Sequence, residues 1–413
     1  MRIVEILSNQ ELEIIDYMNW EVLTVGEDHR LAAWLSDFSL LGAMSEDGSG
    51  LFPVLYRSED GDKVDLRIEG DLLYVNGNVR SIVLSGEENR NFATWFASVG
   101  REDLQSIDFV QVDEGNLARH RPELAAIAEA SPNCSILDPD EGFTQTFGGR
   151  SKPLLVAPDG NTKLEGFDLG EVRLLLIDGG SSSADPSPLI GLSLPNLHGV
   201  YLKNGSGDST VNLEAFPQIR ALSAFGSIPV LTGLPELKTL FLNSGDMAAV
   251  PDLNDLPHPE RLRYLAIAGT WAEVKGTDRL TGLEYLNPGT ISETELEAVL
   301  VANPNLIFLD LIYAELTSLK PLAMAPRVEG IALGDIDSGL DLTPLRDLKH
   351  LRYIGLSETA LDDPAIVAKV RESCPGCVVY GQDTFCLGSG WLLLALPVMA
   401  LAILIKWVRE KRV

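Results

Sequence analysis

Cysteine pairs and clustered carboxylates are the residues of this chain that could do chemistry, and few of them are spaced for it. Cys374 and Cys377 form a Cys-Pro-Gly-Cys motif, which is the spacing of a redox pair or of half a zinc site. Because no second pair has matching spacing, we interpret the motif as a buried structural pair. Residues 335–341 and 59–62 are acidic clusters without the terminal glutamate of a calcium loop, so both are interpreted as solvated loops.

The positions of the histidines argue against an enzyme, and the net charge argues against a nucleic-acid-binding protein. The five histidines fall at scattered positions, and neither a GxSxG nor an HExxH motif occurs. We therefore predict no catalytic residues, no metal site, no cofactor and no enzymatic activity. Sixty acidic against 32 basic residues give a net charge of -28, which repels nucleic-acid phosphates, and no basic stripe is evident along the sequence. Nucleic acid is not expected as a partner.

The middle of the chain repeats one apolar pattern: an apolar residue, two positions, an apolar residue, one position and a third apolar residue. The seven steps from Leu197 to Leu351 average 22 residues, which is a leucine-rich-repeat period. The pattern begins at Val172, Leu197, Ile219, Leu237, Leu262, Leu283, Leu306, Val328 and Leu351.

One stretch, Leu340 to Leu356 (LDLTPLRDLKHLRYIGL), closely resembles the short bacterial repeats of internalin-like proteins. The resemblance implies an α/β leucine-rich-repeat solenoid with a parallel β-sheet on its concave face. This chain departs from the family at the ninth repeat position, usually Asn, so the turns must be satisfied by other groups. The residues at that position are Gly205, Gly245, Thr270, Ala314 and Thr359.

Three longer segments, starting at Glu123, Glu295 and Ala365, each read as a helix that runs into a strand. Ser292 with Glu295 forms a capping box at the start of one such helix. Aligned this way, Cys134 and Cys377 take the position of Leu306, the first buried residue of a repeat strand.

The repeat pattern divides the chain. Weak copies, at Val79 to Leu84 and Leu104 to Phe109, place weak repeats at 76–165, and clear repeats follow at 166–383, so that one solenoid covers 76–383. Residues 1–75 are predicted to be an N-terminal cap region, since a solenoid needs its end covered. Within the cap we expect a hairpin from Val64 with its turn at 69–71, and a short helix from Leu31 to Leu41.

The C-terminus carries a membrane signal. The run from Leu387 to Ile405 contains no charged residue and is long enough for a transmembrane helix, and residues 406–413 form a basic tail. The tail is typical of a cytoplasmic end, which would put the repeats on the exported side, although the first residues show no export signal. Either the true start lies upstream of Met1, or the protein is tail-anchored with its body on the cytoplasmic face; we favour the exported body. The glycines at 388–390 also resemble a cleavable sorting signal of bacterial surface proteins.

Aromatic residues share offsets within the repeats, between the core positions, where side chains point outwards. We predict that they form a column on the concave face that binds a protein or carbohydrate ligand. Tyr264, Tyr285, Phe308 and Tyr353 take the third position, and Tyr201 and Phe241 the fifth. The expected function is that of a membrane-anchored recognition or scaffold protein. Three alternatives remain: rings that cover one another and bind nothing, a structural surface spacer, and an enzyme.

Overall fold

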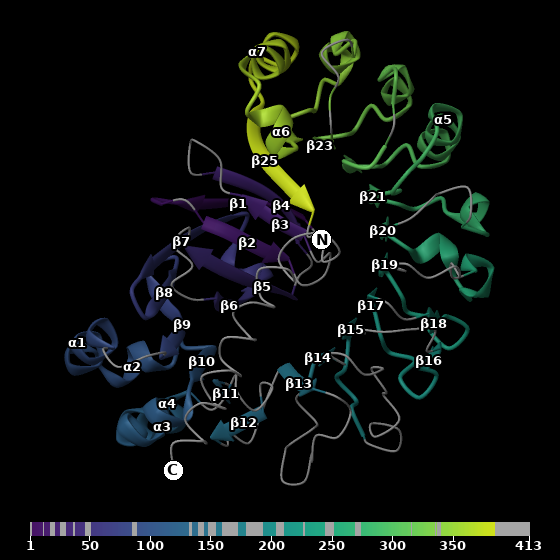
Figure 1. The fold of residues 1–413 in the computed structure, drawn as a ribbon. Coiled ribbons are helices and arrows are strands. Elements are labelled where there is room, and N and C mark those ends of the chain that lie inside the picture. Colours follow the sequence, from purple (N-terminus) through teal and green to yellow (C-terminus); the bar gives the residue numbers. More distant parts are fainter. Residues whose placement is uncertain are drawn as a thin grey trace, which may run out of the picture.

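The structure is a computed structural model, and its strands form an arc that is closed by the N-terminal part of the chain (Figure 1). Strands line the inner side of the arc and short helices its outer side. The structure describes residues 2–10, 12–16, 21–24, 30–35, 38–45, 51–84, 89–131, 134–138, 144–147, 154–158, 172–178, 193–203, 210–225, 228–243, 252–268, 274–314, 316–334, 336 and 340–384.

Each of the nine clear repeats predicted from the sequence is confirmed, because a strand begins two residues after every predicted start. Neighbouring strands pair in parallel and in register, as in Leu240 opposite Leu265. The repeat strands are β14 (Leu174–Asp178), β15 (Gly199–Lys203), β17 (Ala221–Phe225), β19 (Thr239–Asn243), β20 (Tyr264–Ala268), β21 (Tyr285–Asn287), β22 (Phe308–Leu311), β23 (Gly330–Leu333) and β24 (Tyr353–Leu356). They are preceded by β13 (Leu154–Pro158) and followed by β25 (Val378–Thr384).

The core of the arc is made by the three apolar positions of each repeat. In the repeat that starts at Leu262, this residue is buried together with Leu265 and Ile267 in one continuous cluster. The first apolar residues of all nine repeats belong to the same cluster. Because one repeat cannot bury its own apolar face, stacking of neighbours supplies the stabilisation.

Short helices on the outer side return the chain between strands. Helix α5 begins after the predicted capping box, in which Ser292 N donates to Glu295 Oε2 over 3.0 Å. All three predicted helix-to-strand units are confirmed, with α4, α5 and α7 each followed by a strand. The helices here are α5 (Glu293–Ala302), α6 (Glu358–Leu361) and α7 (Pro364–Ser373), and the 3-10 turns are η4 (Leu253–Asp255), η5 (Pro259–Arg261), η7 (Thr277–Arg279), η8 (Lys320–Met324) and η9 (Thr343–Asp347). A small parallel sheet joins β16 (Thr210–Asn212) to β18 (Ile228–Val230).

Side-chain amides satisfy backbone groups on the side of the sheet where the repeat strands begin. Asn303 is buried, donates to the carbonyls of Leu280 (3.1 Å) and Val299 (3.0 Å), and accepts from the backbone N–H of Leu283. Gln218 donates to the carbonyl of Leu194 over 2.7 Å. Both contacts reach into the preceding repeat, so these amides satisfy buried backbone groups between neighbours.

The N-terminal part adds a second sheet, in the order β12-β11-β10-β9-β8-β7-β1-β4. Strands β9, β10 and β11 pair in parallel where weak repeats were predicted. The copy at Val79 to Leu84 coincides with β9, whereas the second copy begins at Ile107 rather than Leu104, because Val110 lies opposite Ile82. The strands of this sheet are β1 (Arg2–Ser8), β4 (Arg30–Leu35), β7 (Lys63–Glu69), β8 (Leu72–Val75), β9 (Asn78–Leu84), β10 (Phe109–Val112), β11 (Ser135–Asp138) and β12 (Thr144–Phe147), and its helices are α1 (Arg90–Ser98), α2 (Arg101–Leu104), α3 (Glu114–Arg119) and α4 (Arg121–Ala130).

Two local predictions in this region have different outcomes. The hairpin is confirmed, because β7 and β8 pair antiparallel around Gly70, whose φ of 57° suits glycine. The helix from Leu31 to Leu41 is wrong, because residues 31–35 lie in β4 and residues 38–41 in β5 (Phe38–Ser45). Pairing of β4 with β1 outweighs the helical propensity of this short apolar run.

Strands from the N-terminal part of the chain also close the repeat sheet. Strand β25 pairs in parallel with β24 and antiparallel with β3, so the order continues β25-β3-β2-β5-β6. These strands are β2 (Leu12–Asp16), β3 (Glu21–Thr24), β5 (Phe38–Ser45) and β6 (Leu51–Arg57), followed by η1 (Ser58–Asp60). Strands β2, β3, β5 and β6 of the predicted cap region therefore extend the sheet beyond the last repeat, although they come before all the repeats in the sequence. An open edge strand is thereby paired.

The predicted transmembrane segment, Leu387 to Ile405, and the basic tail lie outside the described residues. In the ranges that the structure does describe, no helix is long and apolar enough to span a bilayer. The domain boundaries at 75, 165 and 383 stay predictions.

Candidate binding surfaces of the repeat sheet

The predicted aromatic residues meet on the concave side of the sheet, as their shared repeat offsets implied. Tyr264 lies opposite Tyr285, and Tyr285 lies opposite Phe308, in the strand register. The two tyrosine rings stack with centroids 4.0 Å apart, and the rings of Tyr285 and Phe308 are 5.4 Å apart. We call these three stacked rings the aromatic strip.

The other three predicted rings are placed differently. Tyr201 and Phe241 belong to the same hydrophobic cluster as the strip, whereas Tyr353 packs in the cluster of the N-terminal strands with Tyr56 and Tyr380. Gly330 lies between Phe308 and Tyr353 in the register and interrupts the column.

The rings are not exposed, which corrects the expected open surface. All six side chains are at most 6% exposed. The cluster that holds the strip also contains Leu55 of β6 and Phe109 of β10, so the N-terminal strands contribute to the apolar interior of the arc. Whether the six rings bind a ligand stays a prediction.

A buried carboxylate lies beside the strip. Asp310 of β22 accepts hydrogen bonds from the hydroxyl of Tyr285 (3.3 Å), the amide of Asn287 (3.2 Å) and the backbone N–H of Ile312 (3.0 Å). Such hydrogen bonds offset part of the cost of burying a charge. This group orients the Tyr285 ring and gives the strip a polar margin.

Gly330 lets Phe308 complete the strip, because a Cβ atom at this position would overlap the ring of Phe308. We expect Gly330→Ala to displace that ring and lower the free energy of unfolding by about 1–3 kcal/mol. The measurement is urea-induced unfolding. Gly376→Ala is the matched control, since no atom lies within 4 Å of its added Cβ. Equal stability of the two variants would contradict the close packing of Phe308.

A row of basic side chains follows the margin of the same sheet. The residues at the second position of five consecutive repeats are joined by backbone hydrogen bonds of 2.8 Å, each N–H donating to the carbonyl of its predecessor. We call this row the basic rim: Arg173, His198, Arg220, Lys238 and Arg263. The rim corrects the inference that the chain carries no basic stripe, which the sequence conceals because successive members stand about one repeat apart.

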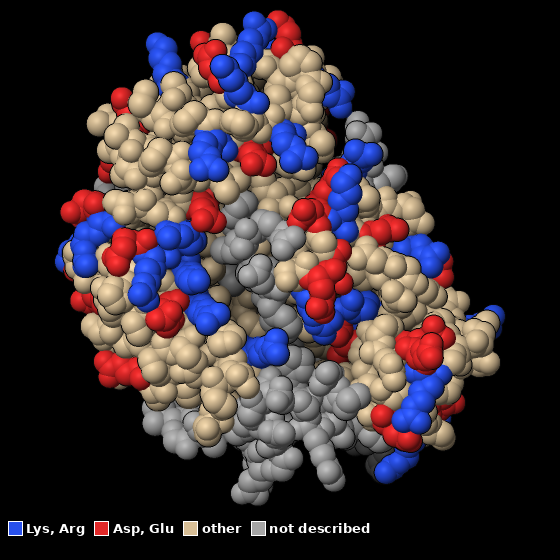
Figure 2. All heavy atoms as spheres, turned by 180° about the vertical axis from the view of Figure 1, so that it is seen from behind, with Lys and Arg blue, Asp and Glu red and all other residues tan. Residues whose placement is uncertain are grey.

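The cations of the basic rim are unevenly paired. Arg263 lies 3.7 Å from Glu284, and further along the row Arg352 lies 3.8 Å from Glu329. In contrast, Arg173, Arg220 and Lys238 are exposed and form no ion pair with a carboxylate of the described residues. Figure 2 shows Lys and Arg side chains gathered along the inner margin of the repeat half of the molecule.

His198 contributes no charge to the basic rim near neutral pH. Partial burial lowers the pKa of His198, and the cations of Arg220 and Arg173 lower it further. The same influence shows that these three side chains lie close enough to interact. The positive charge of the rim therefore comes from its arginines and its lysine.

A second polar site lies where the two large sheets meet. Asp108 accepts hydrogen bonds of 2.6 Å from Arg57 of β6 and from Arg80 of β9, and Arg80 also donates to Asp60 over 3.2 Å. The side chains of Arg57, Arg80 and Asp108 line a cavity of about 330 Å³. The other lining residues are Gln105, Ser106, Ala130 and Ser131. Burial lowers the pKa of Arg80, but Asp108 and Asp60 raise it more, so that the net shift is upwards. Charge balance within the cluster indicates a structural junction.

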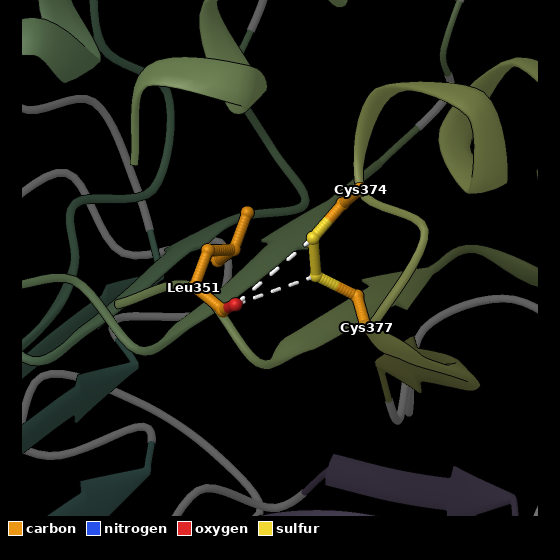
Figure 3. The surroundings of a disulfide bond; sticks show 3 residues. All are labelled: Leu351, Cys374 and Cys377. Atoms are coloured by element: carbon orange, nitrogen blue, oxygen red, sulfur yellow. Dashed lines mark hydrogen bonds between the residues drawn. A yellow bond between two sulfur atoms is a disulfide. The ribbon is translucent and has the colours of Figure 1, made fainter. Parts of the chain in front are cut away.

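The Cys-Pro-Gly-Cys motif forms a disulfide between Cys374 and Cys377 at the end of α7 (Figure 3). Both sulfur atoms face the carbonyl oxygen of Leu351, at 4.0 and 3.6 Å. The pair is half-buried rather than buried, whereas Cys134 is a buried free thiol. Within the described ranges, no cluster of three or more His, Cys, Asp or Glu side chains could hold a metal ion.

Comparison with solved structures finds repeat proteins at low similarity. The TLR13–ssRNA13 complex is 16% identical, with a TM-score of 0.38, over 62% of this chain and 40% of that one. An internalin from Listeria monocytogenes is 16% identical (TM-score 0.29; 55% of this chain and 59% of that one). A leucine-rich-repeat protein from Leptospira interrogans is 14% identical (TM-score 0.30; 67% and 90%). The matches span less than two thirds of the first two of these chains.

No protein-family model matches the sequence, and no curated protein matches it. The architecture is nevertheless defined by the chain itself: nine stacked repeats, each with at least two of its apolar positions in one buried cluster, and parallel pairing of their strands. On this geometry the chain folds as a leucine-rich-repeat solenoid.

Proposed function

We propose that the protein recognises a macromolecular partner along its repeat sheet while its C-terminal segment holds it at a membrane. The observation that carries the proposal is the basic rim of a chain with net charge -28, where Arg173, Arg220 and Lys238 are exposed without a carboxylate partner among the described residues. Unpaired cations on one margin create a local positive field, which attracts partners of opposite charge. The aromatic rings are proposed as a second part of the binding surface, although they are buried in this structure.

A structural spacer is the second candidate function. The stacking of Tyr264, Tyr285 and Phe308 favours it, because rings that pack on one another stabilise the arc without any ligand. A spacer does not require unpaired cations on one rim, and so the basic rim favours recognition.

Membrane attachment rests on the apolar run from Leu387 to Ile405 and on the basic residues after it. We propose the exported side for the repeats, with the cytoplasmic face as the alternative. The test is to fractionate cells that produce the full chain or residues 1–386. The full chain should stay in membranes through a high-salt wash, and the truncated chain should be soluble and folded. Truncated protein that still sediments with membranes would contradict the anchor.

Orientation needs a separate measurement in the same cells. Protease added outside intact cells should digest the repeats of the full chain if the body is exported. Complete protection of the repeats would favour the cytoplasmic face.

A further inference from the structure

We infer that the basic rim binds an acidic polysaccharide, a linear chain with about one carboxylate on each sugar, laid across the repeat strands. The inference rests on the proposed function and names the ligand class for that surface. Its carriers are Arg173, Arg220 and Lys238, which have no carboxylate partner among the described residues.

The distance between neighbouring residues of the basic rim indicates how far apart the charges of a matching ligand lie. Backbone hydrogen bonds fix one rim residue on each strand, and neighbouring strands lie roughly 4.8 Å apart. A single nucleic-acid strand carries a charge about every 3.4 Å, and a duplex about every 1.7 Å. In an extended acidic peptide successive side chains point to opposite faces, so carboxylates on one face lie roughly 6.8 Å apart. The length of a pyranose residue lies between these spacings, so a chain with one carboxylate per sugar is closest to one rim residue per strand, of which His198 is uncharged near neutral pH.

The overall charge of the protein points the same way. A net charge of -28 repels a dense polyanion at long range, and this repulsion grows with the charge of the ligand. A sparsely charged chain experiences less repulsion and can still pair with the cations that it meets at the rim. Arginine suits this pairing, because its planar guanidinium binds a carboxylate through two parallel hydrogen bonds.

The concave residues beside the basic rim have small side chains. The concave residues next to His198, Arg220 and Lys238 are Gly199, Ala221 and Thr239. Gly199 and Thr239 are buried and Ala221 is partly buried, so the ligand contacts the cations along the margin of the sheet rather than on the concave face. Near Arg263 the neighbour is Tyr264, the first ring of the aromatic strip.

The rim changes character at its far end. Glu284 and Glu329 occupy the same repeat position and pair with Arg263 and Arg352. An acidic ligand is therefore confined to the strands from β14 to β19. This confinement predicts a short binding site rather than one that runs the length of the arc.

The test is to titrate the full chain, in neutral detergent, with alginate oligomers, poly-glutamate, oligo-thymidylate or neutral dextran. The rim variant carries Arg173→Ser, Arg220→Ser and Lys238→Ser. The control variant carries Arg261→Ser, Arg279→Ser and Arg327→Ser, which changes the net charge equally at exposed arginines outside the rim. Alginate should bind the wild type and the control, with an affinity that falls as salt rises, and dextran should not bind. The rim variant should lose roughly tenfold or more in affinity.

Both variants replace exposed side chains, so their melting temperatures should stay near that of the wild type. Should the rim variant be less stable, Arg220→Glu alone supplies the same readout, with a loss of alginate binding greater than that of Arg261→Glu. Alginate binding that falls equally in the rim and control variants would overturn the inference, because it would report net charge only.

Two further outcomes overturn the inference without touching the proposed function. In one, none of the acidic polymers binds the wild-type protein. In the other, oligo-thymidylate or poly-glutamate binds the rim more tightly than alginate, and the ligand is of another class. Membrane fractionation and external proteolysis report on the proposed function independently of any polymer.

Discussion

Tyr285→Ala should lower the free energy of unfolding by about 3–5 kcal/mol, as truncation of a buried aromatic ring does. Tyr285 lies in the middle of the aromatic strip, is only 2% exposed, and stacks against Tyr264 on one side and Phe308 on the other. Its removal leaves a cavity between two rings that the rigid register of the strands cannot close. The measurement is urea-induced unfolding of the full chain, followed by tyrosine and tryptophan fluorescence and by circular dichroism.

Tyr285→Phe separates the ring from its hydroxyl. This variant keeps the stacking and loses the hydrogen bond to Asp310, which keeps the amide of Asn287 and the N–H of Ile312. The expected cost is about 1.5–3 kcal/mol, the range for one hydrogen bond to a charged group. If Tyr285→Ala cost no more than Tyr285→Phe, the strip would not be a packed part of the interior.

The repeat sheet could be predicted from the sequence because its signal is local and recurs. Leu262, Leu265 and Ile267 show their spacing within one short segment, and the same spacing returns in every repeat. The row of Tyr264, Tyr285 and Phe308 followed from the shared offset, since parallel strands in register place equal offsets side by side. The short run from Leu31 to Leu41 offered no such repetition, and its strand pairing with β1 depends on residues elsewhere.

Burial of the strip could not be predicted from the repeats. Repeat periodicity says which side chains leave the core on the concave side, but it does not say what lies opposite them. Leu55 and Phe109, which share the cluster of the strip, come from segments where the repeat pattern is absent or weak. Closure of the sheet by β3 and β25 joins strands from opposite ends of the described chain, so no local pattern could indicate it.

The basic rim can be found in the sequence only when the repeats are aligned with one another. Arg220 and Lys238 stand almost one repeat apart, and the chain between them is neutral or acidic in places. Only stacking of the repeats turns these positions into neighbours, with a backbone hydrogen bond of 2.8 Å between them. Reading the second position of successive repeats would have revealed the row before the structure did.

Asp108→Ala should be as costly as loss of the Tyr285 ring, for an electrostatic reason. Asp108 is buried and joins Arg57 of the repeat-containing sheet to Arg80 of the N-terminal sheet, both over 2.6 Å. Without the carboxylate of Asp108, Arg80 keeps its ion pair with Asp60 (3.2 Å), and Arg57 keeps only a longer one with the exposed Glu59 (4.0 Å) among the described residues. Removing one partner from a buried ion pair costs about 3–5 kcal/mol, because the remaining charge has lost its compensation. The midpoint of urea-induced unfolding should fall accordingly, and the loss should persist in salt.

Glu129→Ala is the control for this prediction, because Glu129 forms an ion pair of 3.2 Å with Arg101 on the surface. Both side chains there are more than two thirds exposed, so the expected cost is about 0–1 kcal/mol and should shrink as salt screens the pair. Each variant removes one carboxylate, but Asp108 is buried between two arginines, whereas Glu129 contacts one arginine on the surface. Asp108→Ala and Glu129→Ala variants of equal stability would mean that Asp108 does not hold the two sheets together. A large loss for Asp108→Ala alone would instead show that the Arg57–Asp108–Arg80 cluster stabilises the contact between the two large sheets. This contact is a second junction, separate from the pairing of β3 with β25.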